Sequence, residues 1–361
     1  MSSEFGKNIK VSIFGESHSD AIGMVLSGID AGEEIDITEL ESFLARRAPG
    51  KSQLSTSRNE PDKPKVLSGL LNGKTTGTPL AVIVENRDVK SKDYENIRKC
   101  PRPSHSDYAA HIKYGEAHDI RGGGHFSGRL TAPLCIAGGI CKQILSRKGI
   151  TIGAHIGSIG NICDDKFDSV GISEKQLKFI SEMDFPVINE KSAVADGMKD
   201  EILAAKENGD SVGGTIECCI LGVEAGTGEP IFDGIENNIS KAVFGIPAVK
   251  GIEFGSGFEA CKVHGSVNND PLYYDSDKII KTKTNNNGGI TGGLANGMPI
   301  IFNVAFKPTP SISIEQETVD LYNKENTTIN IEGRHDPCIV PRAVPCVEAA
   351  AAVAILDLIM E

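Results

Sequence analysis

The chain has no long apolar run. Of its 361 residues, 39% are hydrophobic and 24% are charged, a balance typical of a globular protein with a large core. The longest largely apolar stretch, residues 349–359, is well short of the roughly 18 residues that span a bilayer. The opening Met1-Ser2-Ser3-Glu4 lacks the apolar centre of a signal peptide. We therefore expect a cytoplasmic protein with no membrane partner.

The sequence also lacks linkers and paired cysteines. No Ser/Gly tract, charge block or low-complexity repeat interrupts it, so we expect a single domain over residues 1–361. Its nine cysteines are an odd number without any C-x-x-C pair, which favours reduced buried thiols over disulfides or a zinc site. The net charge of −12 disfavours nucleic acid as a partner, so any basic site must be local.

Familiar catalytic and nucleotide-binding motifs are missing as well. The patterns G-x-G-x-x-G, G-x-x-x-x-G-K-[ST] and H-E-x-x-H do not occur, and no glycine follows Ser17 at the spacing of a nucleophile elbow. Four histidines at spacings of 6, 7 and 7 (His105, His111, His118 and His125) could suggest a metallohydrolase. Proline and glycine interrupt that stretch and the spacing does not place four ligands on one helix, so we expect no metal.

Helical and extended patterns alternate along the chain, which indicates an α+β or α/β class. The predicted helices, two of them with capping boxes at Thr38 and Ser173, cover residues 36–46, 131–148, 173–183, 192–208 and the tail after Pro345. The predicted strands cover residues 10–14, 23–29, 79–85, 214–223 and 298–306. Residues 26–32 and 220–226 share a pattern in which an apolar segment is followed by a glycine, an apolar residue, an acidic residue, an alanine and a second glycine. The match indicates either two related halves or chance.

Basic and polar side chains collect beside glycine and proline in five segments. After a predicted strand, residues 15–20 present His18 at a strand end, where side chains reach clefts. Residues 46–58 carry Arg46, Arg47 and Arg58 with several hydroxyl groups, an arrangement suited to carboxylate or phosphate. A purely structural role is the alternative to anion binding: cations near a helix C-terminus interact favourably with the helix dipole. This role accounts for Arg46 and Arg47 but not for Arg58.

The other three segments extend this pattern. Residues 102–108 hold His105 in a proline-stiffened loop beside Arg102 and Asp107, as expected of a general acid next to an anion-binding cation. Residues 121–129 place three glycines before a helix, where backbone N–H groups can approach a ligand closely. The last segment is bipartite: residues 284–311 end in a candidate phosphate cradle around Lys307, and residues 333–337 contain Asp336 as a candidate base.

Taken in order, these segments resemble those of chorismate synthases over nearly the whole chain. The matches are Gly15-Glu16-Ser17-His18, Arg46-Arg47 with Pro49-Gly50, Leu67-Ser68-Gly69 with residues 73–79, Arg102-Pro103-x-His105-x-Asp107-Tyr108, Ala248-Val249-Lys250-Gly251, Lys307-Pro308-Thr309-x-Ser311-Ile312 and residues 333–338. The resemblance implies an α+β, single-domain β-α-β sandwich with internal pseudo-symmetry and a homotetramer. It also implies 1,4-elimination of phosphate from 5-enolpyruvylshikimate-3-phosphate with reduced flavin mononucleotide (FMN).

The resemblance also implies roles for individual residues. His105 would protonate the leaving phosphate, because a histidine pKa of about 6.5 suits that transfer. His18 would offset charge at flavin N1, and Asp336 would steer or accept the C6 proton. The predicted substrate-binding residues are Arg46, Arg47, Arg58, Arg102, Arg129 and Arg334. The predicted flavin-binding residues are Ser127, Asn286, Asn287, Lys307, Thr309, Ser311 and Arg334.

One loop departs from the family's pattern. After the triple glycine, where most members read Arg-Ser-Ser-Ala-Arg-Glu-Thr, this chain reads His125-Phe126-Ser127-Gly128-Arg129-Leu130-Thr131, and Asn287 replaces a usual alanine. We expect local repacking, with His125 still donating to flavin or substrate. A flavin- or phosphosugar-binding protein without catalysis is the main alternative, although it would not need His18, His105 and Asp336. No nicotinamide fingerprint is present, so an external reductant such as a flavin reductase is expected.

Overall fold

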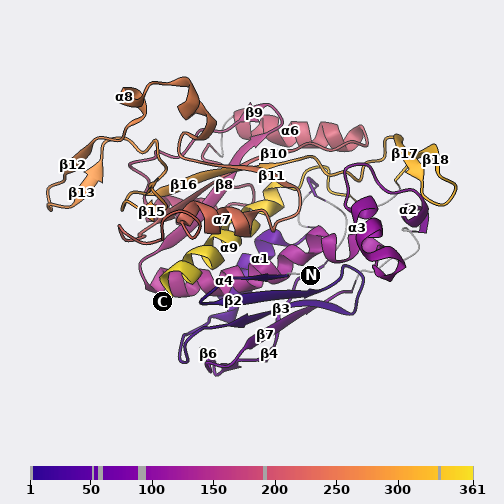
Figure 1. Ribbon diagram of the computed structural model, residues 1–361, viewed down its shortest axis with the longest axis horizontal. Coiled ribbons are helices and arrows are strands. Elements are labelled where there is room, and N and C mark those ends of the chain that lie inside the picture. Colours follow the sequence, from indigo (N-terminus) through magenta and orange to yellow (C-terminus); the bar gives the residue numbers. More distant parts are fainter. Residues whose placement is uncertain are drawn as a thin grey trace.

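Two antiparallel sheets enclose a layer of helices in the computed structural model of the chain (Figure 1). The structure describes residues 3–50, 53–55, 60–87, 95–189, 193–331 and 335–360. The first sheet has the strand order β1-β2-β3-β7-β4 and the second the order β11-β16-β10-β8-β9. Helix α4 packs on the first sheet and α9 on the second, and the two helices pack against each other.

The N-terminal half contains these elements: β1 (Glu4–Phe5), β2 (Lys10–Gly15), β3 (Ala21–Ser27), α1 (Ile37–Arg47), β4 (Lys65–Ser68), β5 (Leu70–Leu71), β6 (Lys74–Thr75), β7 (Leu80–Glu85), α2 (Glu95–Lys99), α3 (Asp107–Tyr114) and α4 (Thr131–Arg147). Three short 3-10 turns, η2 (Gly115–Ala117), η3 (Arg121–Phe126) and η4 (Gly128–Leu130), lead from α3 into α4. They carry the glycine-rich loop to the N-terminal end of α4.

The C-terminal half contains β8 (Thr151–Ile159), β9 (Ile162–Cys163), α5 (Glu174–Ser181), α6 (Ala193–Glu207), β10 (Gly214–Leu221), α7 (Ile235–Val243), β11 (Val249–Phe254), η5 (Gly257–Lys262), α8 (Gly265–Asn268), β12 (Leu272–Tyr274), β13 (Ile280–Thr282), β14 (Ile290–Thr291), β15 (Leu294–Ala295), β16 (Ile300–Phe306), β17 (Gln316–Asp320), β18 (Glu325–Ile329) and α9 (Val340–Ile359). The β12–β13 and β17–β18 hairpins extend at opposite ends of the long axis (Figure 1).

The two halves repeat one topology. The order β2-β3-α1-β4-hairpin-β7-α4 corresponds to β8-β10-α7-β11-hairpin-β16-α9, apart from intervening elements such as β9, α5 and α6, which lie between β8 and β10. Corresponding strands occupy the same positions in their sheets. The two similar sequence segments, residues 26–32 and 220–226, lie at equivalent places. Gly28 follows β3 and Gly222 follows β10, with φ of 88° and 86°. A side chain at either glycine would collide with a backbone carbonyl, of Asn8 and Gly149 respectively. The predicted α+β class and pseudo-symmetry are confirmed.

Helix α9 forms the centre of the core. Its run Ala349–Ala354 is at most 1% exposed, and one contiguous cluster of buried apolar side chains joins both sheets through α4 and α9. A helix that is apolar on all sides is expected in this position, because it is covered on every face. Within the described part of the chain, no helix has the length and apolarity to cross a membrane.

Most predicted elements are present, with two corrections at helix starts. Asp36, rather than Thr38, caps α1, since its carboxylate accepts from the backbone N–H groups of Thr38 and Glu39 at 2.7 and 3.2 Å. Ser173 caps α5 as predicted. The final helix begins at Val340, before the predicted start after Pro345, because Pro341 fits the first turn and Pro345 is accommodated inside the helix.

Candidate active site

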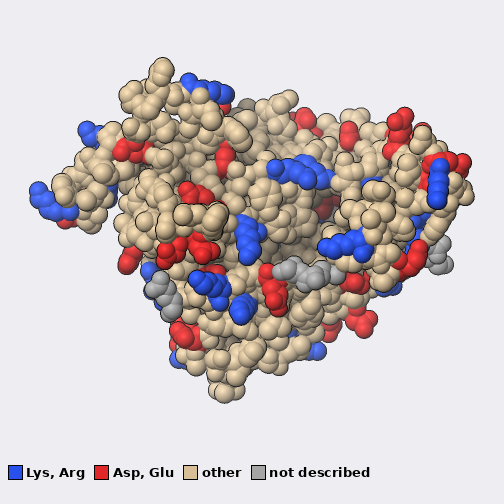
Figure 2. All heavy atoms as spheres, in the orientation of Figure 1, with Lys and Arg blue, Asp and Glu red and all other residues tan. Residues whose placement is uncertain are grey.

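A cavity of about 570 Å³ lies where the N-terminal ends of α4 and α9 meet the loops after β16 and before α3. Among the described residues, five cationic side chains and two carboxylates line it: Arg47, Arg102, Arg129, Lys307 and Arg342, with Glu60 and Asp336. Elsewhere, over the described part of the face in Figure 2, acidic and basic side chains are interspersed. The cavity therefore concentrates positive charge inside a protein of net charge −12, which favours an anionic ligand.

His105 is fixed by the start of α3. Its Nδ1 lies 2.5 Å from Oδ1 of Asp107, the first residue of that helix. Arg102 donates to the same carboxylate from Nε at 2.7 Å and from Nη2 at 2.9 Å. Arg102 and Asp107 are both buried, whereas the His105 side chain keeps 15% exposure on the cavity wall. The imidazole is thus held in one orientation beside the cavity.

Burial and neighbouring charges both change the pKa values of His105 and Asp107. Burial lowers the pKa of His105, the hydrogen bond to Asp107 opposes that effect, and the positive charges of Arg102 and Lys307 add to the lowering. For Asp107, burial alone would raise the pKa, but the hydrogen bonds from Arg102 and His105 hold it far below its ordinary value. Asp107 is therefore ionised and His105 is neutral at neutral pH without a ligand.

The glycine-rich loop separates His18 from His105. Gly122, Gly123 and Gly124 have φ of 60°, 85° and 54°, conformations that only glycine adopts readily. A Cβ at position 122 would lie 2.4 Å from the His18 ring, and one at position 123 would lie 3.4 Å from His105 Nε2. His18 is 7% exposed and lies directly behind Gly122, so the backbone of the loop, not the His18 side chain, lines the cavity.

A buried ion cluster forms the wall next to α4. Asp62 pairs with Arg47 and with Arg129, and Arg47 also donates to Gly128 O at 3.1 Å. Burial alone would raise the pKa of Asp62, but the two guanidinium groups hold it below its ordinary value. Nη2 of Arg129 is buried without a hydrogen-bond partner in the described structure, and Glu60 Oε2 is 3.7 Å away. Arg129 therefore has donor capacity to offer a ligand.

The opposite wall carries the predicted phosphate cradle. Lys307, Thr309 and Ser311 all line the cavity, as does Ser127. Lys307 Nζ donates to Ser104 O at 3.1 Å, and Ser311 Oγ accepts from Arg102 Nη1 at 3.1 Å. Burial and the charge of Lys250 lower the pKa of Lys307, as expected for an ammonium group that has no anion beside it.

Asp336 is oriented by the first turn of α9. Arg342 Nη1 pairs with Asp336 Oδ2, and Arg342 Nε donates to Arg47 O at 3.0 Å. Thr309 Oγ1 donates to the backbone oxygen of Asp336 at 2.9 Å. His335 also lines the cavity, and its Nε2 is a second buried nitrogen without a hydrogen-bond partner within the described ranges. Burial, with the nearby charge of Arg102, lowers the pKa of His335.

Besides His18, three predicted residues within the described ranges do not line the cavity. Arg46 points into the helical layer and makes a two-pronged ion pair with Glu348, at 2.9 and 2.7 Å. Asn286 and Asn287 bind Asp270 through their backbone N–H groups at 2.7 and 2.9 Å, away from the cavity wall. These positions assign Arg46 to helix packing and both asparagines to loop structure. Arg58 and Arg334 lie outside the described residues.

In the loop that departs from the family's pattern, residues 125–131, the contacts of His125 differ from those expected. Its Nδ1 lies 2.8 Å from Gly15 O and its Nε2 lies 2.8 Å from Ser3 Oγ. Nδ1 must carry the proton to meet a carbonyl oxygen, so Nε2 accepts from the hydroxyl group. Both nitrogens are therefore committed to the N-terminal strand region, and the expectation that His125 donates to a ligand was wrong.

Sequence reasoning missed several cavity residues. Arg342 could have been predicted from the sequence. A cation in the first turn of a helix interacts unfavourably with the helix dipole, which indicates an anionic partner nearby. Glu60 and His335 carried no comparable signal, and neither did Asp62, which pairs with Arg47 and Arg129 of the wall. Ala248, with φ of 73°, also lines the cavity, and its carbonyl oxygen accepts from Lys307 N at 3.0 Å. Its strained backbone could not be read from the sequence.

The four spaced histidines do not form a metal site. His105 and His125 line the large cavity, whereas His111 and His118 line a separate small pocket beside α3. Across the described ranges, no three His, Cys, Asp or Glu side chains are grouped so that they could hold a metal ion.

Comparison with known proteins points to one family. The family model described as "Chorismate synthase" matches residues 9–360. The chain is 46% identical over 352 residues to a chorismate synthase of Thermococcus kodakarensis, covering 98% of this chain and 96% of that protein. It is 45% identical over 357 residues to one of Korarchaeum cryptofilum, covering 99% and 97%. A crystal structure of a chorismate synthase superposes with a TM-score of 0.76 at 29% identity, covering 98% and 92%.

Proposed function

Since the chain belongs to the chorismate synthase family, we propose that its cavity binds 5-enolpyruvylshikimate-3-phosphate with reduced FMN and forms chorismate. The reaction is the 1,4-elimination of phosphate that ends the shikimate pathway, catalysed by a carbon-oxygen lyase. The observation that carries the proposal is His105, held by Asp107 at the wall of a cationic cavity. A non-catalytic binding protein would not require this arrangement of acid and anion site.

His105 is proposed as the acid for the leaving phosphate. With Nδ1 directed at Asp107, its Nε2 is the nitrogen left to face the ligand. An anionic phosphate beside the ring favours the imidazolium, which then donates its proton as the C3–O bond breaks. Arg102 lies next to His105 and neutralises part of the phosphate charge. Binding of the substrate thus charges the acid that the reaction needs.

Asp336 is proposed as the acceptor of the C6 proton. It is a carboxylate of the cavity wall, and Arg342 holds it in place through an ion pair to Oδ2. Arg47, Arg129 and Arg342 supply positive charge for the two substrate carboxylates. Arg58 and Arg334 are retained as proposed ligands, and Arg334 directly precedes His335 in the chain.

The residues present fit FMN. Two buried nitrogens on the cavity wall, Nη2 of Arg129 and Nε2 of His335, have no hydrogen-bond partner among the described residues. Lys307, Thr309 and Ser311 would hold the FMN phosphate, and Ser127 with the glycine-rich loop would contact the rest of the cofactor. When bound, reduced FMN supplies an electron that returns at the end, so the elimination has no net redox change. His18, directly behind Gly122, is proposed to offset negative charge through that loop.

Three further features belong to the proposal. We propose that the enzyme is cytoplasmic, forms a homotetramer, and receives reduced flavin from an external reductase that draws on NADPH. The family relationship supports the assembly.

The test is anaerobic incubation of the purified protein with 5-enolpyruvylshikimate-3-phosphate, FMN and dithionite, following phosphate and chorismate together. Equimolar release of both, and none with oxidised FMN, is expected. If FMN binds but neither product appears, the chain is a binding protein built on this fold.

A further inference from the structure

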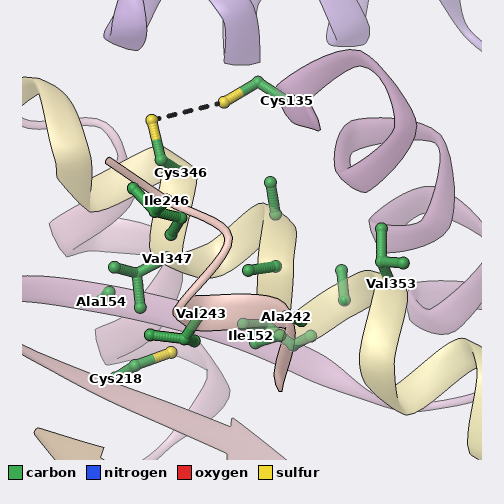
Figure 3. Packing of buried hydrophobic residues seen from close by; sticks show 14 of the residues in the cluster. Cys135, Ile152, Ala154, Cys218, Ala242, Val243, Ile246, Cys346, Val347 and Val353 are labelled. Carbon is green, nitrogen blue, oxygen red and sulfur yellow. Dashed lines mark hydrogen bonds between the residues drawn. The ribbon is translucent and has the colours of Figure 1, made fainter. Parts of the chain in front are cut away.

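Two thiols from different helices meet behind the cavity wall. Sγ of Cys135 on α4 lies 3.7 Å from Sγ of Cys346 on α9 (Figure 3). Cys135 is fully buried and Cys346 is 2% exposed. Only Cys346 lines the cavity, so a small solute in the cavity reaches one thiol of the pair and not the other. Neither thiol has a part in the proposed elimination.

The surroundings give the two sulfurs different character. The hydrogen bond from Cys135 and the positive charges of Arg47 and Arg342 lower the pKa of Cys346, against the effect of burial. Burial, together with the same hydrogen bond, raises the pKa of Cys135. Cys346 therefore has the lower pKa of the two thiols and lies at the cavity wall, with Cys135 directly behind it.

The distance also suits a disulfide. A disulfide has an S–S length of about 2.05 Å, so the sulfurs must approach by roughly 1.6 Å from their present separation. Both side chains have a single χ1 rotation that moves the sulfur, and both helices are anchored in the core. The bond would link α4 to α9, and thus the last helix of one half to the last helix of the other.

We propose that Cys346 and Cys135 form a peroxide-sensitive thiol pair, in which Cys346 is oxidised from the cavity and Cys135 closes a disulfide. In the first step the Cys346 thiolate attacks one oxygen of hydrogen peroxide, the O–O bond breaks, and the departing hydroxide takes up a proton to leave as water. In the second step Cys135 attacks the Cys346 sulfenic acid, the S–O bond breaks and water leaves. Two thiols and one peroxide thereby give one disulfide and two waters.

The site has a natural source of this oxidant. Hydrogen peroxide forms when dioxygen oxidises a reduced flavin, so an enzyme that holds reduced FMN would meet peroxide inside its own cavity. That source depends on the proposed function, whereas the thiol chemistry does not. An experiment with added hydrogen peroxide and without flavin therefore tests the pair even where the proposed function fails.

The experiment uses the full chain with the exposed Cys163 and Cys261 changed to serine, which leaves seven of its nine cysteines. The reduced protein is treated with hydrogen peroxide, its free thiols are counted, and a non-reducing tryptic digest is analysed by mass spectrometry. We expect the loss of two thiols and a cross-linked peptide that joins Cys135 to Cys346, both reversed by dithiothreitol.

Three variants separate the steps. In C135A, Cys346 should stop at the sulfenic acid, which dimedone traps. In C346A, Cys135 should stay reduced, because it has no route to the oxidant. The matched control is C218A, which removes a buried thiol away from the cavity and should leave the cross-link intact. The proposal fails if no cross-linked peptide forms, or if Cys346 is oxidised no faster than Cys218. Both readouts use the parent protein, in which Cys135 and Cys346 are intact, and neither needs C135A, C346A or C218A to fold.

Discussion

Nδ1 of His105 and Oδ1 of Asp107 lie 2.5 Å apart, and this contact decides which ring nitrogen can react. Arg102 Nη2 lies 3.1 Å from the same nitrogen, but a guanidinium cannot donate to an N–H group, so the shorter contact to Asp107 sets the tautomer. The proton therefore sits on Nδ1, and Nε2 is left for the ligand. Asp107 also holds Arg102, so one carboxylate positions both the acid and its neighbouring cation.

Replacing His105 tests the acid directly. His105→Ala should retain ligand binding and lower kcat by about 10²- to 10⁴-fold, the usual contribution of a positioned general acid. His118→Ala is the matched control, because His118 lies near the same loops but outside the cavity. Steady-state release of phosphate measures both variants. Unchanged turnover in His105→Ala would remove His105 from the mechanism.

Binding of the anionic substrate should draw a proton from solution. In the free protein the pKa of His105 is lowered, chiefly by burial, so the ring is neutral at neutral pH. A phosphate beside the ring raises that pKa again, and the protein then takes up a proton near pH 7. Calorimetric titration with substrate in two buffers of different ionisation enthalpy measures the uptake, and His105→Ala should abolish it. Equal heats in both buffers would contradict the prediction.

Lys307 should matter for FMN through its charge. Lys307→Met keeps the aliphatic chain but removes the ammonium group beside Ser104, and we expect FMN to bind at least about tenfold more weakly, the effect of roughly 1.4 kcal/mol. Lys250→Met removes an exposed cation nearby that does not line the cavity and should bind FMN as the parent protein does. Quenching of flavin fluorescence measures both. Equal affinities in the two variants would move the phosphate away from Lys307.

Local patterns in the sequence predicted much of this fold. Glycine- and proline-bounded apolar runs located β2, β3, β7, β10 and β16, because each of these short strands carries several apolar side chains. Strand β8 was missed, since two glycines and His155 interrupt its apolar pattern, although most of its residues are buried. The pseudo-symmetry depends on pairings between distant strands. The only sign of it in the sequence was the similar pattern around Gly28 and Gly222.

The site was predicted where a motif holds its own residues together. Arg102, His105 and Asp107 lie within six residues, and their mutual contacts follow from that short loop. Arg46 and Arg47 are adjacent in sequence, yet only Arg47 faces the cavity, because consecutive positions on a helix point about 100° apart. The partner of Arg46, Glu348, is 302 positions away, and no sequence pattern links the two.

Glu348 should therefore stabilise the fold rather than bind substrate through Arg46. It is fully buried and pairs with Arg46 at 2.7 Å and with Lys142. Burial would raise its pKa, but those two cations lower the pKa to about 2. Because the folded pKa lies below the ordinary value of about 4.3, this stabilisation is present above pH 4.3 and is lost as the pH falls toward 2.

Glu348→Gln removes the charge but keeps the shape, which leaves two cations without a buried partner at a cost of about 3–5 kcal/mol. We expect the melting temperature to fall by on the order of 5–10 °C at pH 7, and by progressively less below pH 4. Arg46→Met should also lower the melting temperature, although Lys142 still pairs with Glu348 in that variant. Its KM for the substrate should stay within about twofold, because Arg46 does not reach the cavity. A large rise in KM with unchanged melting would instead return Arg46 to the substrate site.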